Sequence, residues 1–173
     1  MILGLIVLLS EFNLADVDRI QSLLKHCVHI ERWAEEITQR RPYASPTDLM
    51  AYAEQCAKTW QWDEILAALN THPRIGEKKA QSDLSTKEQA FSSREQANLS
   101  QDQDTLDAIY QGNIAYEKKY GFIFLIKASE LDSQQVLTAL NYRLANDRET
   151  EQCIVHQQLS EIALLRLSQE VNT

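Results

Sequence analysis

Glycine and proline, which often end or break regular structure, are scarce in this sequence. Only four glycines and three prolines occur among 173 residues, and the apolar residues between them recur mostly at three- and four-residue intervals. Because that spacing places apolar side chains along one face of an α-helix, it predicts helices rather than strands. The sequence therefore predicts an all-α fold, a bundle of about seven to nine helices in a single domain over residues 1–173.

Local start and stop signals divide the chain into the expected helices. Ser45 followed by Pro46 is typical of a helix start, and Gly121 is typical of a helix end. The apolar residues 122–126 fit either a buried extended stretch or the start of a buried helix. The expected helices cover residues 14–40, 45–59, 61–69, a short stretch after residue 76, 85–99, 102–120, 132–144 and 147–171.

The charge balance limits the classes of ligand. Acidic residues outnumber basic ones by 25 to 17, which gives a formal net charge of −8. No cluster of Lys and Arg is interleaved with aromatic residues, so the composition argues against a nucleic-acid partner. An anionic substrate would need a local positive site, because the overall field opposes its approach.

The cysteines and the N-terminal segment indicate a compartment. Cys27, Cys56 and Cys153 are odd in number and have no C-x-x-C spacing, which argues against a disulfide framework or a structural zinc site and favours a reducing cytoplasm. The apolar start has no basic residues before it and is too short to span a bilayer, so no membrane association is expected. Residues 1–10 fit vector-derived residues, a buried first segment or a degenerate signal, of which we favour the first two.

His72 is a candidate for proton transfer. Pro73 disfavours helical backbone at His72, so this histidine stands at a forced helix end. Imidazole titrates near neutral pH, which suits general acid or base catalysis. The same histidine also fits a plain helix C-terminus, where it interacts with the helix dipole.

A hydroxyl, a carboxylate and a carboxamide follow in residues 85–89. Ser85-x-x-Glu88 has the spacing of a capping box, in which both side chains satisfy the first N–H groups of a helix. The next heptad repeats the pattern as Ser92-x-x-Glu95. The pattern alone leaves open whether Glu88 serves a site or only caps a helix.

Arg166 interrupts an apolar stripe on the expected last helix. Val155, Leu159, Ile162 and Arg166 fall within a narrow arc at 100° per residue. A guanidinium in such a stripe needs an anionic or hydrogen-bonding partner, because burying it unpaired is costly. That partner is either a protein carboxylate, such as Glu170, or a substrate carboxylate or carbonyl bound by the guanidinium fork.

Two other polar patterns suggest structural or surface roles. Asn113 lies among aromatic and aliphatic residues of an expected helix, where a buried amide is usually structural. His26 and His29 are three residues apart, but no further ligand set accompanies them, which predicts a solvated surface rather than a metal site.

Five motifs occur in a characteristic order. They are His72-Pro73-Arg74-Ile75-Gly76, Ser85-x-x-Glu88-Gln89, Asn113-x-x-Tyr116 with Tyr120-Gly121-Phe122-x-Phe124, Arg143-Leu144-x-Asn146, and Ile162-Ala163-x-Leu165-Arg166-Leu167. In these motifs the chain resembles the 2-oxo-4-hydroxy-4-carboxy-5-ureidoimidazoline (OHCU) decarboxylase family, which catalyses the last step from urate to (S)-allantoin. The resemblance covers nearly the whole chain, and the ordered set is far more specific than any one motif.

The resemblance implies an all-helical, usually dimeric decarboxylase that works without a cofactor or metal. His72 would be the acid/base residue, with Glu88 beside it and Arg166 as the clamp for an anionic ureidoimidazoline substrate. It also favours Glu88 over Glu95 for the site. The pocket would be lined by Pro73, Ser85, Thr86, Lys87, Gln89, Phe124, Leu125, Ile126, Lys127 and Ala128.

The chain departs from the family in places, and other functions remain open. Many members have His-Pro-Asp-Leu-Ala-Gly at the first motif and a longer spacer to the second. The C-terminal residues 171–173 differ from the Ser-Lys-Leu peroxisomal address of some relatives. The alternatives are a non-catalytic helical interaction domain, with Arg166 in a core ion pair, and a hydrolase that uses His72 and Glu88 to activate water.

Overall fold

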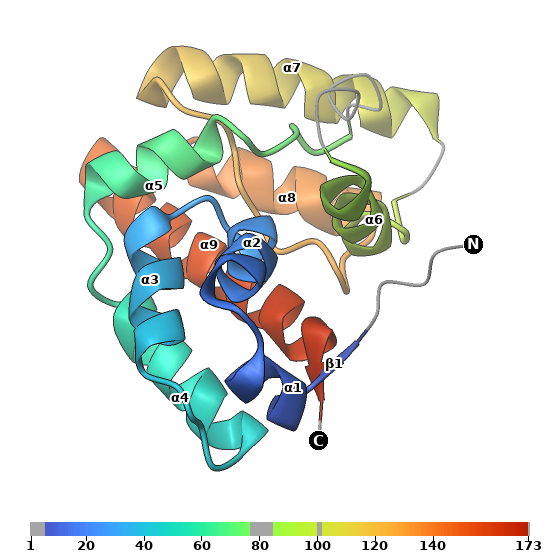
Figure 1. Cartoon of the computed structure of the whole chain (residues 1–173). Coiled ribbons are helices and arrows are strands. Elements are labelled where there is room, and N and C mark those ends of the chain that lie inside the picture. Colours follow the sequence, from blue (N-terminus) through green and yellow to red (C-terminus); the bar gives the residue numbers. More distant parts are fainter. Residues whose placement is uncertain (1–5, 77–84, 100–101, 173) are drawn as a thin grey trace. The chain divides into compact units, whose positions relative to one another are not determined.

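A computed structural model describes residues 6–76, 85–99 and 102–172 (Figure 1). In this part of the chain the fold consists of nine helices and one small parallel sheet, which confirms the expected all-α class and helix number. The elements are β1 (Val7–Leu8), α1 (Leu9–Leu14), α2 (Val17–Cys27), α3 (Glu31–Gln39), α4 (Pro46–Ala57), α5 (Trp62–Leu69), α6 (Thr86–Glu95), α7 (Gln103–Tyr120), α8 (Ser133–Arg143), α9 (Arg148–Glu170) and β2 (Val171–Asn172). None of the helices described is long and apolar enough to cross a membrane.

The chain divides into two compact units. The first unit comprises Met1–Ala68 and Ser160–Thr173, and the second unit comprises Leu69–Leu159. Helix α9 begins in the second unit and ends in the first. The expected single-domain organisation stays a prediction.

The first unit is built on helices α2, α3 and α4. Helix α2 packs against α3, and α3 packs against α4, where Trp33 Nε1 donates to the carbonyl of Ala53 at 2.9 Å. The two strands pair in parallel, with Val7 opposite Val171. Buried side chains in this unit include Phe12, Ile20, Leu24, Trp33, Ile37, Leu49 and Ile65, and from α9 Ile162 and Leu167.

The single helix expected over residues 14–40 is wrong, because the chain breaks twice in this range. Helix α1 ends at Leu14, and Val28 and Ile30 are extended between α2 and α3. Both β-branched side chains are buried, at 0% and 2% exposure. The break lets α2 and α3 pack against each other, so tertiary burial overrides the helical pattern of the sequence.

The second unit is organised around helix α7, which packs against α8 (Figure 1). The ends of α7 follow the sequence signals: the side chain of Asp102 accepts from the Thr105 N–H, and Gly121 terminates the helix at φ +80°. Asp132 likewise caps α8. Glycine suits the positive φ at Gly121 because it has no Cβ to clash.

Other expected boundaries differ in detail. Helix α6 ends at Glu95 rather than near residue 99, and the short helix expected after Gly76 lies outside the residues described. Residues 122–128 contain no helix or strand, while Phe122, Phe124 and Leu125 are buried. Of the two possibilities for this stretch, the start of a buried helix is therefore wrong, and residues 122–128 form a largely buried segment without regular structure.

Gly112 sets the close approach of α7 and α8, since a Cβ there would overlap the side chain of Leu140. Leu140 is fully buried and has little room to shift. We expect Gly112→Ala to lower the free energy of unfolding by about 1 kcal/mol, because overpacking of about 1–3 kcal/mol outweighs a helix-propensity gain of about 1 kcal/mol. Urea denaturation measures the change, with the exposed Gln111→Ala as control. A more stable Gly112→Ala protein would contradict the close packing.

Candidate active site

The His72 loop begins where helix α5 ends. The backbone N–H of His72 donates to the carbonyl of Leu69 at 3.0 Å, and Pro73 then prevents the helix from continuing. Both residues are half-buried. The imidazole is therefore attached to a fixed piece of backbone, as the sequence predicted, and remains partly accessible.

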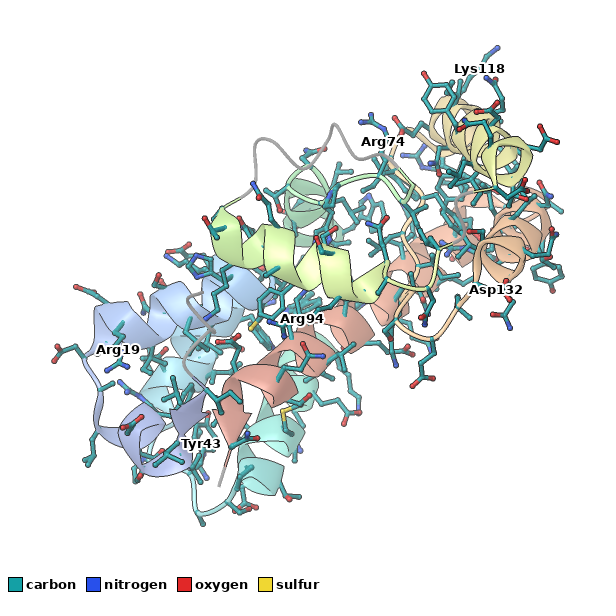
Figure 2. All side chains as sticks on the ribbon, turned by 90° about the vertical axis from the view of Figure 1, so that its right-hand side faces the viewer. Arg19, Tyr43, Arg74, Arg94, Lys118 and Asp132 are labelled. Carbon is teal, nitrogen blue, oxygen red and sulfur yellow. The ribbon has the colours of Figure 1, made fainter. Side chains whose placement is uncertain are left out.

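Helix α7 holds the residues that follow His72. Asn113 donates from Nδ2 to the carbonyl of Ile75 at 3.1 Å, and Glu117 forms an ion pair with Arg74, whose Nη2 is 2.9 Å from Oε2 (Figure 2 labels Arg74). Asn113 is only 2% exposed, so its bond forms in a water-poor setting where unsatisfied polar groups are costly. These contacts fix the loop from one side and agree with the structural role expected for Asn113.

A second anchor for the same loop comes from helix α6. The N–H of Gly76 donates to Oε1 of Gln96 at 3.1 Å, and Gly76 has a φ of +81°. Gln96 follows the last residue of α6, so the two ends of the segment 76–96 are tied together by one hydrogen bond. The loop that carries His72 is thus joined to both α6 and α7.

Ser85 and Glu88 form a reciprocal capping box at the start of α6. Glu88 Oε2 accepts from the N–H and the hydroxyl of Ser85, at 2.9 and 2.6 Å, and the Glu88 N–H donates to Ser85 Oγ at 3.3 Å. Ser85 and Thr86 are exposed, whereas Lys87, Glu88 and Gln89 are half-buried. The structure thus shows the capping contact, and the catalytic role of Glu88 stays a prediction.

The second Ser-x-x-Glu pattern does not form a cap. Ser92 lies inside α6 with 1% exposure, and its hydroxyl accepts from Gln96 Nε2 at 3.1 Å. The expectation that Ser92 and Glu95 could occupy capping positions is wrong, because α6 runs unbroken from Thr86 to Glu95 and no helix starts at Ser92. Although both heptads have the Ser-x-x-Glu spacing, only Glu88 lies in the first turn of α6 and takes part in a capping box.

The predicted lining segment 124–128 is largely buried. Phe124, Leu125 and Ala128 are between 2% and 5% exposed, and Ile126 and Lys127 are half-buried. Its backbone is held by side chains from α8 and α9. Arg143 donates to the carbonyl of Leu125, and Gln158 accepts from the N–H of Lys127.

The roles of Arg143 and Glu151 were missed by sequence reasoning. Their side chains form an ion pair at 2.8 Å with 6% and 0% exposure, and Glu151 also accepts from Tyr116. Burial, reinforced by the hydrogen bond to Glu151, raises the pKa of the Tyr116 phenol well above its usual value, so Tyr116 stays a donor. The signal was present in the sequence: Arg143 follows Val136 and Leu140 on an apolar face, as Arg166 does on α9.

Arg166 lies in the first unit and is buried, with 5% exposure. Its Nη1 donates to the carbonyl of Cys27, the last residue of α2, at 3.2 Å. This end of a helix carries partial negative charge, which favours a guanidinium. The expected stripe is confirmed, since Val155, Leu159 and Ile162 are buried, but the meeting of Arg166 with His72 and Glu88 stays a prediction.

A separate open cavity of about 310 Å³ lies in the first unit, where Arg40 stands over the rings of Tyr43 and Tyr52. No predicted site residue lines it. Within the residues that the structure describes, no group of three or more His, Cys, Asp or Glu side chains is arranged to hold a metal ion.

The chain is similar to one protein family and to several known proteins. The sequence model described as OHCU decarboxylase matches residues 13–168. A 2-oxo-4-hydroxy-4-carboxy-5-ureidoimidazoline decarboxylase of Haloferax volcanii is 25% identical over 166 residues, 95% of this chain and 96% of that protein. The uric acid degradation bifunctional protein PucL of Bacillus subtilis is 28% identical over 145 residues, 83% of this chain. The chain spans only 28% of the length of PucL.

Two solved structures share the fold. One is an OHCU decarboxylase in the presence of (S)-allantoin, with a TM-score of 0.69 and 24% identity over 83% of this chain and 93% of that chain. The other is an (S)-allantoin synthase, with a TM-score of 0.68 and 21% identity over 96% of this chain and 55% of that chain. At these identities the likeness is one of fold.

The capping box at α6 predicts a specific loss of stability. Ser85→Ala removes the oxygen that accepts from the Glu88 N–H and should lower the free energy of unfolding by about 0.5–2 kcal/mol. Ser93→Ala, at an exposed position inside the same helix, is the control and should change it by less than about 0.5 kcal/mol. Urea denaturation of both variants measures the difference, and equal effects would argue against the cap.

Proposed function

Because the chain belongs to the OHCU decarboxylase family, we propose that it removes CO2 from OHCU and forms (S)-allantoin in uric acid degradation. The family match over residues 13–168 carries this proposal. The His72 loop supports it, because a half-buried imidazole on an anchored backbone can transfer a proton to a bound ring. The activity would be that of a carboxy-lyase.

The proposed reaction needs no covalent intermediate on the protein. The bond between the ring carbon and its carboxylate breaks, CO2 leaves, and the electron pair moves into the adjacent C=N bond, as it would into the carbonyl of a β-keto acid. A proton then adds from one face to the carbon of the former C=N bond, which bears the ureido group, while the hydroxyl on the carbon that lost CO2 gives up its proton and becomes the carbonyl of allantoin. The protein has to orient the carboxylate out of conjugation, stabilise the developing charge and deliver the proton.

In this proposal His72 moves the proton and Glu88 adjusts its basicity. Glu88 can serve both as a cap and as a charged neighbour, because a carboxylate has two oxygens and about four acceptor positions. The two hydrogen bonds from Ser85 both reach Oε2. Gln89 and Lys87, in the first turn of α6, would contribute polar contacts to the ring oxygens and to the negative charge.

Arg166 supplies the local positive charge that an anionic substrate needs in a chain with a net charge of −8. Its guanidinium is buried, and Nη1 donates to the carbonyl of Cys27. A planar fork can bind a carboxylate or carbonyl in one orientation, which an ammonium group does less well. We propose that this fork fixes the substrate carboxylate.

The protein is also proposed to act as a homodimer in the cytoplasm. The exposed apolar residues Tyr110 and Ile114, about half-exposed and one turn apart on α7, support an interface. Light scattering after size-exclusion chromatography measures the mass. A monomer at assay concentration would remove the dimer from the proposal and leave the decarboxylation untouched.

A non-catalytic helical domain is the second candidate, favoured by the capping contact of Glu88 and the helix-end contact of Arg166. The two functions differ in one assay. The protein is incubated with freshly generated OHCU, and CO2 release and the mass and chirality of the product are followed against a sample without protein. Enzyme-dependent CO2 release with (S)-allantoin supports the decarboxylase, water addition without CO2 loss indicates a hydrolase, and no acceleration indicates a binding domain.

His72→Asn should lower kcat at least about 100-fold, because an amide cannot take up or release the proton near neutral pH. The fold should persist, since Asn113 holds the backbone of Ile75 and Glu117 holds the side chain of Arg74 in the same loop. Circular dichroism of the folded protein accompanies the rate measurement. Full activity in a folded His72→Asn protein would remove His72 from the mechanism.

Arg166→Lys keeps a positive charge but loses the planar fork. We expect kcat/KM to fall by about 100-fold with little change in the thermal midpoint, because lysine can still donate to the carbonyl of Cys27. Arg19→Lys, on the exposed side of α2 (Figure 2), is the matched control in the same unit. A loss of stability with unchanged kcat/KM would instead assign Arg166 to the core.

A further inference from the structure

Residues 122–128 are a buried stretch of backbone without regular structure. Buried N–H and C=O groups outside helices and strands need side-chain partners. The carbonyl of Leu125 accepts from Arg143 Nη1 at 2.6 Å, and the N–H of Lys127 donates to Gln158 Oε1 at 2.8 Å. Arg143 from α8 and Gln158 from α9 therefore hold this stretch at two points, which lie two residues apart in the sequence.

The guanidinium of Arg143 is itself fixed on its other edge. Its Nε and Nη2 donate to Glu151 Oε2 at 3.0 and 2.8 Å, and Nη2 also lies 3.2 Å from the hydroxyl of Tyr116. The carboxylate of Glu151 accepts in addition from Asn146 Nδ2 at 2.8 Å. With the fork locked in this way, the N–H bonds of Nη1 have fixed directions, and one of them donates to the carbonyl of Leu125.

Arg143 also touches the residue before Leu125. Its guanidinium carbon lies 4.6 Å from the ring centroid of Phe124, and that ring packs edge-on against Tyr116 with centroids 5.3 Å apart. A cation over an aromatic face is attracted to it, and the contact fixes the plane of the ring. Arg143 thus fixes the orientation of the Phe124 ring and of the Leu125 carbonyl, which belong to successive residues.

A buried ion pair is an inefficient way to gain stability, because removing two charges from water offsets most of their attraction. Apolar side chains of similar volume would fill the same space. They could not, however, orient a carbonyl group and a ring at once. The arrangement is therefore better explained by the geometry that it imposes on residues 124–128 than by its contribution to stability.

We propose that Arg143 and Gln158 are positioning residues that hold residues 124–128 as a rigid wall of the substrate pocket. This inference rests on the proposed function, since it needs a substrate against which the wall acts. Substrate orientation decides the rate and the face that receives the proton, and a displacement of about 1 Å can cost about 100-fold in rate. The wall therefore contributes to affinity and to the single handedness of the product.

The test uses the full-length chain with Arg143→Lys and Gln158→Met. Lysine can pair with Glu151 or donate to Leu125, but it cannot hold both directions, and methionine removes the acceptor for Lys127. Arg32→Lys is the matched control, because Arg32 also forms a two-point pair with Glu64 and donates to a backbone carbonyl, that of Thr59. Initial rates with freshly generated OHCU, the enantiomeric excess of allantoin corrected for the uncatalysed reaction, and the thermal midpoint are measured for each.

We expect Arg143→Lys and Gln158→Met each to raise KM about tenfold or more and to lower the enantiomeric excess, while Arg32→Lys stays within about threefold of wild type in both. Loss of folded protein alone lowers the apparent kcat and leaves KM and enantiomeric excess unchanged, so these two readouts separate positioning from stability. If Arg143→Lys does not fold, Gln158→Met decides the outcome. Unchanged KM and enantiomeric excess in the folded variants would overturn the positioning role, whereas an inactive wild-type protein would overturn the proposed function and this inference with it.

Discussion

The carboxylate of Glu151 is the point on which the second unit depends. It is fully buried and accepts hydrogen bonds from Arg143, Tyr116 and Asn146. Desolvating a carboxylate and a guanidinium costs several kcal/mol per ion, and removing one partner of such a pair costs about 3–5 kcal/mol because the other is left unpaired. The network is therefore stable only when it is complete, which fixes α7, α8 and the start of α9 to one another.

The same network extends to the turn between α8 and α9. The hydroxyl of Tyr120 approaches the carbonyls of Arg143 and Asn146 at 2.8 and 2.7 Å, and Lys119 donates to the carbonyl of Asn146. Because the last carbonyls of a helix lack partners within the helix, these side chains satisfy the end of α8. Helix α7 thus contributes Tyr116 to the network that holds residues 124–128, and Asn113 to the loop that carries His72.

Those parts of the fold that depend on local chemistry could be predicted from the sequence. Helices α4 and α8 start at Ser45 and Asp132, whose side chains accept hydrogen bonds from nearby backbone N–H groups. Helix α7 ends at Gly121, because glycine tolerates a positive φ. The break at residues 28–30 could not be predicted. No glycine or proline marks it, and it arises because Val28 and Ile30 gain more from burial than from helical hydrogen bonds.

For the candidate site too, some features could be predicted from the local sequence and others could not. The segments proposed to contain it were chosen by their motifs, and the buried stripe around Arg166 followed from helical spacing. The contacts that fix these segments join residues far apart in sequence, such as Asn113 with Ile75 and Arg143 with Leu125, and no local pattern encodes such pairs. A charged residue in an apolar stripe indicates that its side chain needs a partner, but the identity of the partner depends on the tertiary fold.

The central proposal is that this chain removes CO2 from OHCU and delivers a proton to one face of the ring carbon that bears the ureido group. The most direct measurement is the reaction of freshly generated OHCU with the wild-type protein in D2O, followed by circular dichroism and mass spectrometry of the allantoin formed. We expect enzyme-dependent CO2 release and a single (S)-enantiomer that carries one carbon-bound deuteron. Allantoin formed at the same rate and with the same enantiomer ratio as in a sample without protein would contradict it.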